Sequence, residues 1–552
     1  MATPQLWNHN PVPALPAKEE WVLSEQLYAR ARDRGDDAFL SVDGGPSITY
    51  REALHRSERL AAGLAELGVK KGDRVLLVMD NSAELILSWF AINLLGAVEV
   101  PMNVANQGNS LVHVFNNSAA EVAVVDDRYL AVVVEAAPKL ACLRRVVLRG
   151  GLVPPMPWDA YSFDDVSSSS EAFSRADVSY RDTGAIMYTS GTTGPAKGVV
   201  MPHAHMYLFA RHVVEGLRLT KDDVYMVCLP LFHANAQLMQ VYAALLVGAK
   251  VAVYERFSAS AWIEQIRASG ATVSSLLGVM AQFIYSQRST PRDRAHGLRR
   301  MVTIPLPSVI ADDFEHRFDV TCIEAYGMTE ICLPLYRPLD GTLRPGSCGK
   351  PLTDWFEVEL VNPETDEPVE VGQVGEIVVR PKSAFTTFTE YHAMPERTVE
   401  AWRNLWFHTG DAGRRDEDGH FYFVDRAADR IRKRGENITA YDIEVVLCEY
   451  PGVVEAAVIG VPASEGEDDI KAVVVMSPEV SFEPVKLMDH CVPRLPYFAV
   501  PRYVEAVPEL PKTSNGKILK RTLRAHRDPA AEWDREVHGF RVSRKKAEPS
   551  HA

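Results

Sequence analysis

The chain has 552 residues, of which 47% are hydrophobic and 24% are charged, a composition typical of globular proteins and not of disordered chains. Its formal net charge of −14 argues against a nucleic-acid partner, because both surfaces would be negative. The length exceeds what one hydrophobic core usually supports, so we expect a large domain and a smaller one.

Three features bear on location. The N-terminus lacks the basic and apolar regions of a secretory signal, and the most apolar stretch, residues 85–98, is too short to span a membrane and is predicted to be a buried helix. The seven cysteines are scattered without a CxxC pair, which favours reduced thiols over zinc ligands. We therefore expect a cytoplasmic protein without a membrane span.

Helical and β-rich segments alternate between residues 48 and 330. Amphipathic helices are expected at 49–67, 83–95, 203–217, 236–246 and 261–269. Short apolar strands are expected between them at 74–79, 122–126, 144–148, 224–229 and 250–254. Such strands predict an α/β fold whose sheets are buried on both faces and flanked by helices. Residues 356–380 resemble a hairpin instead, which predicts a β-rich subdomain.

The C-terminal part has its own α+β pattern. Helices are expected at 442–449 and near 485–492, and strands at 454–461 and 470–475. A charged run precedes this region, and a polar, basic segment that we expect to be frayed follows it from Arg527 onward. The resulting domains are an N-terminal domain at 1–424, a hinge at 425–435, a C-terminal domain at 436–527 and a tail at 528–552.

The most informative segment is AIMYTSGTTGPAKGVV, residues 185–200. Glycine N–H groups, hydroxyl groups and an ammonium group in one loop are suited to wrap an anion. The Walker A pattern is not matched, because Ala196 stands where glycine is required. The sequence therefore predicts a phosphate loop of another kind, and a flexible surface loop is the alternative. Its candidate residues are Thr189, Ser190, Gly191, Thr192, Thr193, Gly194 and Lys197.

This loop resembles that of the adenylate-forming superfamily, which includes acyl-CoA synthetases, nonribosomal adenylation domains and firefly-type luciferases. Other segments are similar to motifs of that family and follow in the same order: YGMTE at 326–330, GEIVVR at 375–380, WFHTGD at 406–411, DR at 425–426 and LPKTSNGK at 510–517. The similarity covers about residues 49–521. Residues 421–426 and 434–438 look most like bacterial acyl-CoA ligases of the carnitine/crotonobetaine type.

The resemblance implies a reaction in two halves. A carboxylic acid attacks the α-phosphate of ATP, which gives an acyl-adenylate and pyrophosphate, and the thiol of coenzyme A then takes the acyl group. The implied cofactors are ATP, Mg²⁺ and CoA. A carrier-protein thiol or an amine as acceptor, and a nucleotide-binding protein without catalysis, are the alternatives. The acid is not determined, and a homodimer is left open.

The resemblance also implies residue roles. The loop at 189–197 would hold the β- and γ-phosphates, Thr329 the α-phosphate, and Glu330 the Mg²⁺ ion. Tyr326 would stack on adenine, next to Gly327 and Met328. The remaining implied residues are Asp411 for the ribose, Arg426 for ribose or phosphate, Arg434 beside Gly435 for CoA, and Lys517 for the charge at the reacting phosphorus. Ordinary alternatives are a surface charge for Lys517, a helix N-terminal acid for Glu330, a turn cap for Asp411 and a surface ion pair for Arg426.

The acid pocket is placed by the same resemblance. Its predicted lining is His233, Ala234, Asn235, Gln237, Gly278 and Ala325. The small residues indicate room for a bulky acid, and the two amides could bind a polar group on it. For His233, a packed histidine is the alternative. His203, His205 and His212 are expected to be polar residues on a helix and not metal ligands.

Three departures from the family pattern stand out. Residues 303–308 lack the usual glycine, which predicts unusual adenine contacts. Ala428 stands at the usual hinge pivot, and Arg434 replaces the first glycine of the thiol-tunnel pair. Because adenylation needs Lys517 inserted and thiolation needs it removed, the small domain is expected to be mobile and to rotate about the hinge.

Overall fold

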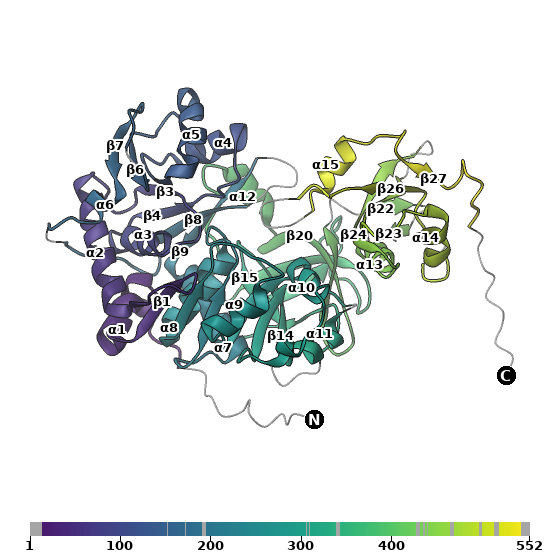
Figure 1. Ribbon diagram of the computed structural model, residues 1–552, viewed down its shortest axis with the longest axis horizontal. Helices are drawn as coiled ribbons and strands as arrows, with labels where there is room; N and C mark the ends of the chain where they lie inside the picture. Colours follow the sequence, from purple (N-terminus) through teal and green to yellow (C-terminus); the bar gives the residue numbers. More distant parts are fainter. Residues whose placement is uncertain are drawn as a thin grey trace. The chain divides into compact units, whose positions relative to one another are not determined.

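The computed structural model describes residues 14–542 with gaps at 152, 172, 190–194, 305, 309, 338–342, 427–430, 434–435, 439, 464–467, 496–498 and 513–517. The chain divides into two compact units (Figure 1). The first comprises Met1–Glu359, Val378–His408 and Asp418–Phe421, and the second comprises Leu360–Ile377, Thr409–Glu417 and Tyr422–Ala552. The predicted hinge lies partly outside the described residues, so the domain boundaries at 424 and 435 stay predictions.

One sheet of the first unit has seven strands in the order β7-β6-β5-β3-β4-β8-β9. They are β3 (Arg74–Val78), β4 (Val98–Pro101), β5 (Val122–Asp126), β6 (Arg145–Arg149), β7 (Asp159–Ser162), β8 (Thr183–Thr189) and β9 (Lys197–Pro202). All neighbours are parallel except β8 and β9. The helices of this region are α2 (Tyr50–Glu66), α3 (Ala83–Leu94), α4 (Gly108–Ser118), α5 (Asp127–Ala136) and α6 (Phe163–Val166).

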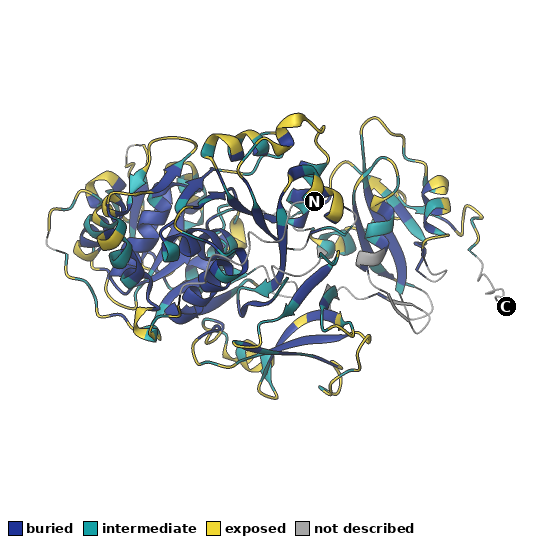
Figure 2. Cartoon of the chain, turned by 90° about the horizontal axis from the view of Figure 1, so that it is seen from below, coloured by how far each residue is buried: buried dark blue, intermediate teal, exposed yellow. Residues whose placement is uncertain are grey.

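A second sheet of the first unit contains the consecutive strands β16-β15-β14-β13-β12-β10-β11-β1-β2. They are β1 (Ala38–Val42), β2 (Ile48–Thr49), β10 (Val224–Val227), β11 (Lys250–Val253), β12 (Val273–Leu277), β13 (Arg300–Ile304), β14 (Thr321–Met328), β15 (Cys332–Tyr336) and β16 (Ser347–Pro351). Its helices include α1 (Leu23–Arg34), α7 (His203–Leu217), α8 (Ala243–Val247), α9 (Trp262–Ser269), α10 (Gly278–Tyr285) and α11 (Ala311–Phe318). The strands are largely buried between the helices (Figure 2).

The predicted helices and strands of this unit are confirmed to within a few residues. The helix predicted at 49–67 begins where Thr49 and Glu52 form a capping box, which satisfies N–H groups of the first turn. The apolar stretch at 85–98 forms most of α3, whose residues are buried except for Glu84. The helix predicted at 236–246 differs, because Asn235–Tyr242 is π-helical before α8 begins. No helix in the described part of the chain has the length and apolarity that a membrane crossing needs.

The border between the two units runs through four β-strands: β17 (Phe356–Val361), β18 (Gly375–Pro381), β20 (Trp406–Arg415) and β21 (Phe421–Arg426). β17 and β18 are hydrogen-bonded neighbours in their sheet, as the predicted hairpin requires. Between β18 and β20 the chain forms α12 (Pro395–Ala401) and the short strand β19 (Trp402–Arg403).

The second unit contains the predicted α+β region. A four-stranded sheet has the order β24-β25-β26-β27, with β24 (Val453–Pro462), β25 (Asp468–Met476), β26 (Tyr503–Val507) and β27 (Trp533–Asp534). The other elements are β22 (Ile431–Lys433), β23 (Glu436–Ile438), α13 (Ala440–Cys448), α14 (Pro484–Cys491) and α15 (Lys520–Ala525). The expected fold class, an α/β chain with a large N-terminal domain and a small α+β C-terminal domain, is confirmed.

The segment at 527–542 is ordered by contacts that its polar composition concealed. β27 pairs antiparallel with β26, and Trp533 packs against the core of this unit. Glu532 forms ion pairs with the buried Lys471 at 2.7 Å and with Arg527 at 2.8 Å. The expectation of a frayed segment beginning at Arg527 is therefore wrong as far as residue 542.

Candidate active site

The ends of the predicted phosphate loop meet at the tip of the β8–β9 hairpin. Thr189 and Lys197 are its last register pair, and the Thr189 hydroxyl donates to the Lys197 carbonyl oxygen over 3.5 Å. A β carbon on the following Gly198 would lie 2.9 Å from Ile186 Cγ2, so glycine permits the close approach of the two strands. The loop residues 190–194 lie outside the described residues, and so do Arg434, Gly435 and Lys517.

The predicted adenine and magnesium segment begins in β14. A register shift between Tyr326 and Met328 falls at Gly327, and the chain then turns, with the Ile331 N–H donating to the Met328 carbonyl oxygen over 3.2 Å. Thr329 and Glu330 lie in this turn. Glu330 is only 2% exposed. A tight turn thus buries the carboxylate that the sequence predicts as a metal ligand.

Tyr391 joins these two segments. Lys197 Nζ donates to the phenol oxygen over 3.2 Å, and the phenol donates to Glu330 Oε1 over 2.9 Å. The ammonium also lies 4.2 Å from the centroid of the tyrosine ring, a cation–π geometry. Burial, together with the neighbouring Glu330 carboxylate, raises the pKa of Tyr391, so the phenol keeps its proton.

Tyr391 is not among the residues predicted from the sequence. It lies in the segment FTEYHAMPERT, residues 388–398, in which no residue indicates a chemical role by itself. Its backbone partners place it. The Val200 N–H donates to the Glu390 carbonyl over 3.0 Å, the His392 N–H to the Gly198 carbonyl over 2.7 Å, and the Phe388 N–H to the Glu330 carbonyl over 2.9 Å. Residues 388–392 therefore connect β9 with the Glu330 turn.

The topology explains how distant segments reach the same site. In the second sheet, β10, β12, β13 and β14 are parallel neighbours, so their carboxyl ends share one edge. His233 follows β10, Gly278 follows β12, and Ala325 lies close to the end of β14. An edge formed by the carboxyl ends of parallel strands is a common ligand-binding position. The predicted pocket residues and the Glu330 turn therefore belong to one edge of the first unit.

His233 carries an unsatisfied polar atom at this edge. Its ring lies 4.5 Å from that of Phe232, and burial lowers the pKa of the imidazole to about 4. Nε2 is buried and has no hydrogen-bond partner within the described structure. The residue as a whole is of intermediate exposure, although Nε2 itself is buried. At neutral pH the ring is uncharged and offers one donor and one acceptor.

The two predicted amides differ in their surroundings. Asn235 begins the π-helix, is partly exposed, and accepts a hydrogen bond from Gln240 over 2.9 Å. Gln237 is fully buried and donates to Oε1 of the buried Glu99 on β4 over 2.6 Å. Burial raises the pKa of Glu99 to about 8, so this carboxyl is protonated at neutral pH. Ala234 is buried beside them.

The predicted ribose-binding residue belongs to the second unit. Asp411 lies on β20 and is 6% exposed, and its N–H donates to Thr409 Oγ1 over 3.1 Å. The Thr409 hydroxyl donates to the Ile377 carbonyl over 2.7 Å, and the Gly410 N–H donates to Glu376 Oε1 over 2.9 Å. The segments at 375–380 and 406–411 therefore pair with each other. Arg426 ends β21, and its side chain lies outside the described part.

The three histidines of α7 are buried and uncharged. Burial lowers the pKa of His203 to about 4 and of His205 and His212 to about 3, so all three are neutral. Within the described residues, no group of three or more His, Cys, Asp or Glu side chains is arranged to hold a metal ion. The expected helix position is confirmed, but these residues are buried in the core.

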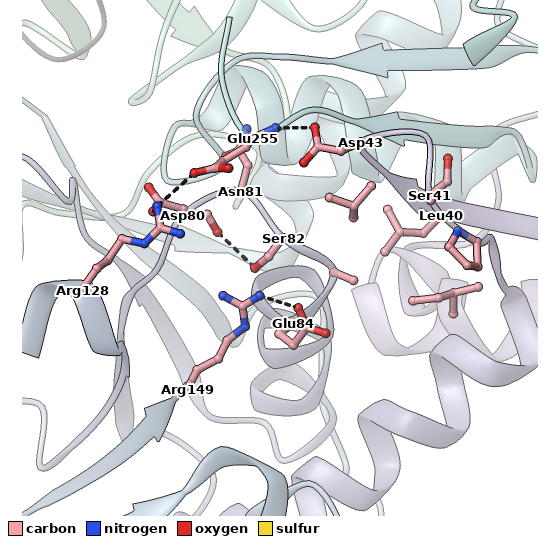
Figure 3. Close-up of a pocket in the computed structure, with 15 residues that line it drawn as sticks. Leu40, Ser41, Asp43, Asp80, Asn81, Ser82, Glu84, Arg128, Arg149 and Glu255 are labelled. Atoms are coloured by element: carbon pink, nitrogen blue, oxygen red, sulfur yellow. Dashed lines mark hydrogen bonds and ion pairs between the residues drawn. The ribbon is translucent and has the colours of Figure 1, made fainter. Parts of the chain in front are cut away.

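A hollow of about 300 Å³ lies at the ends of β1, β3 and β6 (Figure 3). Both arginines in its lining are paired with carboxylates: Arg128 contacts Asp80 at 2.7 Å and Glu255 at 2.9 Å, while Arg149 contacts Glu84 at 2.9 Å. None of the described candidate residues lines it. We therefore assign the active site to the sheet edge that carries the Glu330 turn, and not to this hollow.

Family comparison decides between the interpretations of this geometry. Residues 27–389 match the AMP-binding enzyme family, and residues 442–517 match the AMP-binding enzyme C-terminal domain. The chain belongs to the AMP-binding enzyme family. The predicted membership of the adenylate-forming superfamily is therefore confirmed, and the chain is an enzyme of this family.

Individual relatives support the resemblance to acyl-CoA ligases of the carnitine/crotonobetaine type. The crotonobetaine/carnitine–CoA ligases of Salmonella agona and Salmonella typhimurium are each 31% identical over 490 residues, which cover 86% of this chain and 93% of theirs. The structure of the anthranilate CoA ligase AuaEII in complex with anthranoyl-AMP matches with a TM-score of 0.85 and 26% identity, covering 93% of this chain and 98% of that one. ATP-bound MatB from Rhodopseudomonas palustris matches with a TM-score of 0.82 and 26% identity, covering 92% and 98%. The resemblance to carnitine-type CoA ligases is thereby confirmed.

Proposed function

We propose that this enzyme is an ATP-dependent acid–CoA ligase. It activates a carboxylic acid as an acyl-adenylate with release of pyrophosphate, and then transfers the acyl group to the thiol of CoA. The observation that carries the proposal is the contact chain from Lys197 through Tyr391 to Glu330, which joins the phosphate loop to an acidic turn at a ligand-binding sheet edge. The named CoA ligases among its relatives support the same class of reaction.

The first half-reaction brings two anions together, so its barrier is largely electrostatic. The loop at 189–197 holds the β- and γ-phosphates, and Lys197 supplies a positive charge. Lys517 approaches the α-phosphate and the carboxylate from the C-terminal domain. Rotation about residues 425–435 then withdraws it, so that thiolation follows.

The donor set at Glu330 fits a magnesium ion. Mg²⁺ prefers oxygen ligands and often shares its site between one carboxylate and the phosphates of a nucleotide. Glu330 offers a buried carboxylate next to the phosphate loop, so it would hold the ion together with the triphosphate. When bound, the ion supplies positive charge to the phosphate oxygens.

The remaining contacts to the nucleotide and CoA follow the motif positions. Tyr326 stacks on adenine, and the tight backbone at Gly327 and Met328 lines that site. Thr329 donates to the α-phosphate. The other assignments are Asp411 for the ribose hydroxyls, Arg426 for ribose or phosphate, and Arg434 with Gly435 for CoA.

The acid lies at the edge formed by the ends of β10, β12 and β14. The neutral His233 donates from its unpartnered ring nitrogen to the carboxylate of the acid. Ala234, Asn235, Gly278 and Ala325 line the pocket, and Gln237 supports its wall through Glu99. The cytoplasm, where ATP and CoA are both available, is the compartment we propose.

Incubation with ATP, Mg²⁺, CoA and a panel of acids tests the proposal. The panel contains carnitine, crotonobetaine, anthranilate and benzoate, the acids named in similar enzymes. We expect pyrophosphate release with at least one acid, and acyl-CoA and AMP by mass spectrometry. Pyrophosphate release without acyl-CoA would favour a carrier-protein thiol or an amine as acceptor. ATP binding without pyrophosphate release across a broad panel would favour a non-catalytic nucleotide-binding protein.

A further inference from the structure

We propose that Tyr391 is a positioning residue for adenylation, which holds the Glu330 carboxylate and the Lys197 ammonium in the arrangement that receives a metal-bound triphosphate. This inference rests on the proposed function. It assigns a role to a residue outside the sequence motifs, and it places the phenol between the two charges that the motifs supply.

The hydrogen bonds of this chain have one direction. An ammonium group only donates and an ionised carboxylate only accepts, whereas a phenol does both. The Lys197 ammonium therefore donates to the phenol oxygen over 3.2 Å, and the phenol proton points to Glu330 Oε1 at 2.9 Å. Glu330 is the acceptor at the end of this hydrogen-bond chain, so its Oε1 faces the phenol and not a second acceptor.

Burial gives these contacts their importance. Tyr391 and Glu330 are each 2% exposed, so bulk water has little access to replace a lost donor. A buried carboxylate that loses a hydrogen-bond donor carries an energetic cost and turns toward other donors. The Lys197 ammonium, which shares the phenol with Glu330, is one charged group with which the carboxylate could then pair. A carboxylate so neutralised is a poorer ligand for a cation.

Tyr391 is held by its backbone and by its ring. Its N–H donates to Thr398 Oγ1 over 2.9 Å, and it forms an antiparallel bridge with Val199 of β9. Its ring lies 4.9 Å from that of Phe388, which stacks on Trp402 at 5.9 Å. Lysine, in contrast, has a long flexible side chain. The tyrosine is thus the fixed point from which the carboxylate and the ammonium are positioned.

Binding without turnover tests this role. The probe is α,β-methylene-ATP, which cannot release pyrophosphate, titrated by calorimetry in Mg²⁺ and in EDTA. For Tyr391→Phe we expect binding about tenfold weaker in Mg²⁺, the scale of one hydrogen bond to a charged group, and a smaller loss in EDTA, where only the position of the Lys197 ammonium is affected. Lys197→Met should weaken binding in both conditions, because its charge contacts phosphate directly.

Tyr129→Phe is the matched control. Tyr129 also donates its phenol proton to a carboxylate, that of Asp80, over 2.8 Å, but it lies on α5 by the charge-paired hollow. Its removal should leave nucleotide binding unchanged in both conditions. Thermal unfolding of each variant reports whether the fold is retained.

A double-mutant cycle separates positioning from packing. If Tyr391 acts mainly through Glu330, then Tyr391→Phe combined with Glu330→Gln should lose much less binding in Mg²⁺ than the sum of the two single losses. Additive losses, or equal weakening by Tyr391→Phe in Mg²⁺ and in EDTA, would overturn the proposal. Normal Mg²⁺-dependent binding by a wild-type protein that makes no acyl-CoA would overturn the proposed function and leave the role of Tyr391 intact.

Discussion

Gly327 lies directly against the backbone of Cys332. A β carbon at position 327 would collide with the Cys332 carbonyl oxygen, and it would lie 2.8 Å from Leu333 Cδ2. Cys332 itself has a φ of 59°, in the left-handed region that few non-glycine residues adopt. The turn between these two residues carries Thr329 and Glu330. The position of the proposed metal ligand therefore depends on the absence of a side chain at residue 327.

We expect Gly327→Ala to damage both stability and activity. The backbone of β15 must move to admit the methyl group, which should cost about 2 kcal/mol or more in the free energy of unfolding. Pyrophosphate release should fall at least about tenfold, because Glu330 moves with the turn. Urea unfolding and a pyrophosphate assay measure the two effects.

Gly216→Ala provides a matched control. Gly216 lies in α7, and a β carbon added there would have Ile323 Cγ2, at 4.0 Å, as its nearest heavy atom outside the helix. Alanine in a helix interior is favoured over glycine by about 0.5–1 kcal/mol, so this variant should be as stable as the wild type or more stable. If Gly327→Ala and Gly216→Ala had the same stability and the same rate of pyrophosphate release, steric contact at residue 327 would not control the position of Glu330.

The elements with a clear hydrophobic period were predictable from the sequence. The helix expected at 203–217 has those bounds, and the strand expected at 122–126 also has its predicted bounds. Periodicity reports which residues are buried, and it does so wherever a helix or strand keeps its regular geometry. It did not reveal the π-helix at Asn235–Tyr242, because insertion into the hydrogen-bond ladder leaves the apolar composition unchanged.

The site was predictable as far as its motifs extend. Thr189, Lys197 and Glu330 were identified from local sequence, and the structure brings the last two to a common partner. That partner, Tyr391, was not identifiable, because its role arises from pairing with β9 almost two hundred residues earlier in the chain. The buried contact between Gln237 and Glu99 is of the same kind. The role of each residue depends on its contact with an element that is distant in sequence.

Glu99 makes stability depend on pH. Burial raises the pKa of its carboxyl from the ordinary value of 4.5 to about 8. Between these values the unfolded chain releases the proton while the native protein keeps it, so the free energy of unfolding decreases as pH rises. The slope is at most about 1.4 kcal/mol per pH unit, and the loss is complete above the folded pKa.

Glu99→Gln should remove this dependence. Glutamine keeps the shape of the protonated carboxyl and can still accept from Gln237, so little packing is lost. The variant should gain stability relative to wild type as pH rises from about 5 to about 8.5. Urea unfolding at several pH values measures the difference. Glu324, whose pKa is also raised to about 8 by burial, is present in both proteins, so its contribution cancels. A difference that does not vary with pH would contradict the assignment.

His233 should act as a neutral donor. Burial lowers its pKa to about 4, so its charge should not change between about pH 5.5 and 8. We expect His233→Phe to raise KM for the acid about tenfold with little change in KM for ATP, because one hydrogen bond to a carboxylate is lost. His55→Phe, on the exposed side of α2, is the control. An equal rise in KM for ATP would place the histidine outside the acid pocket.

Lys517 should matter for one half-reaction only. Its ammonium group is proposed to offset the charge that develops when the carboxylate attacks the α-phosphate, whereas the thiol attacks the acyl carbon and forms no bond at phosphorus. Lys517→Ala should therefore abolish pyrophosphate release from ATP and acid. It should leave the conversion of a supplied acyl-adenylate and CoA into acyl-CoA and AMP largely intact. Stopped-flow measurement of each half-reaction distinguishes the two. Loss of both to the same extent would indicate that the lysine supports the fold of the C-terminal domain and not the chemistry at phosphorus.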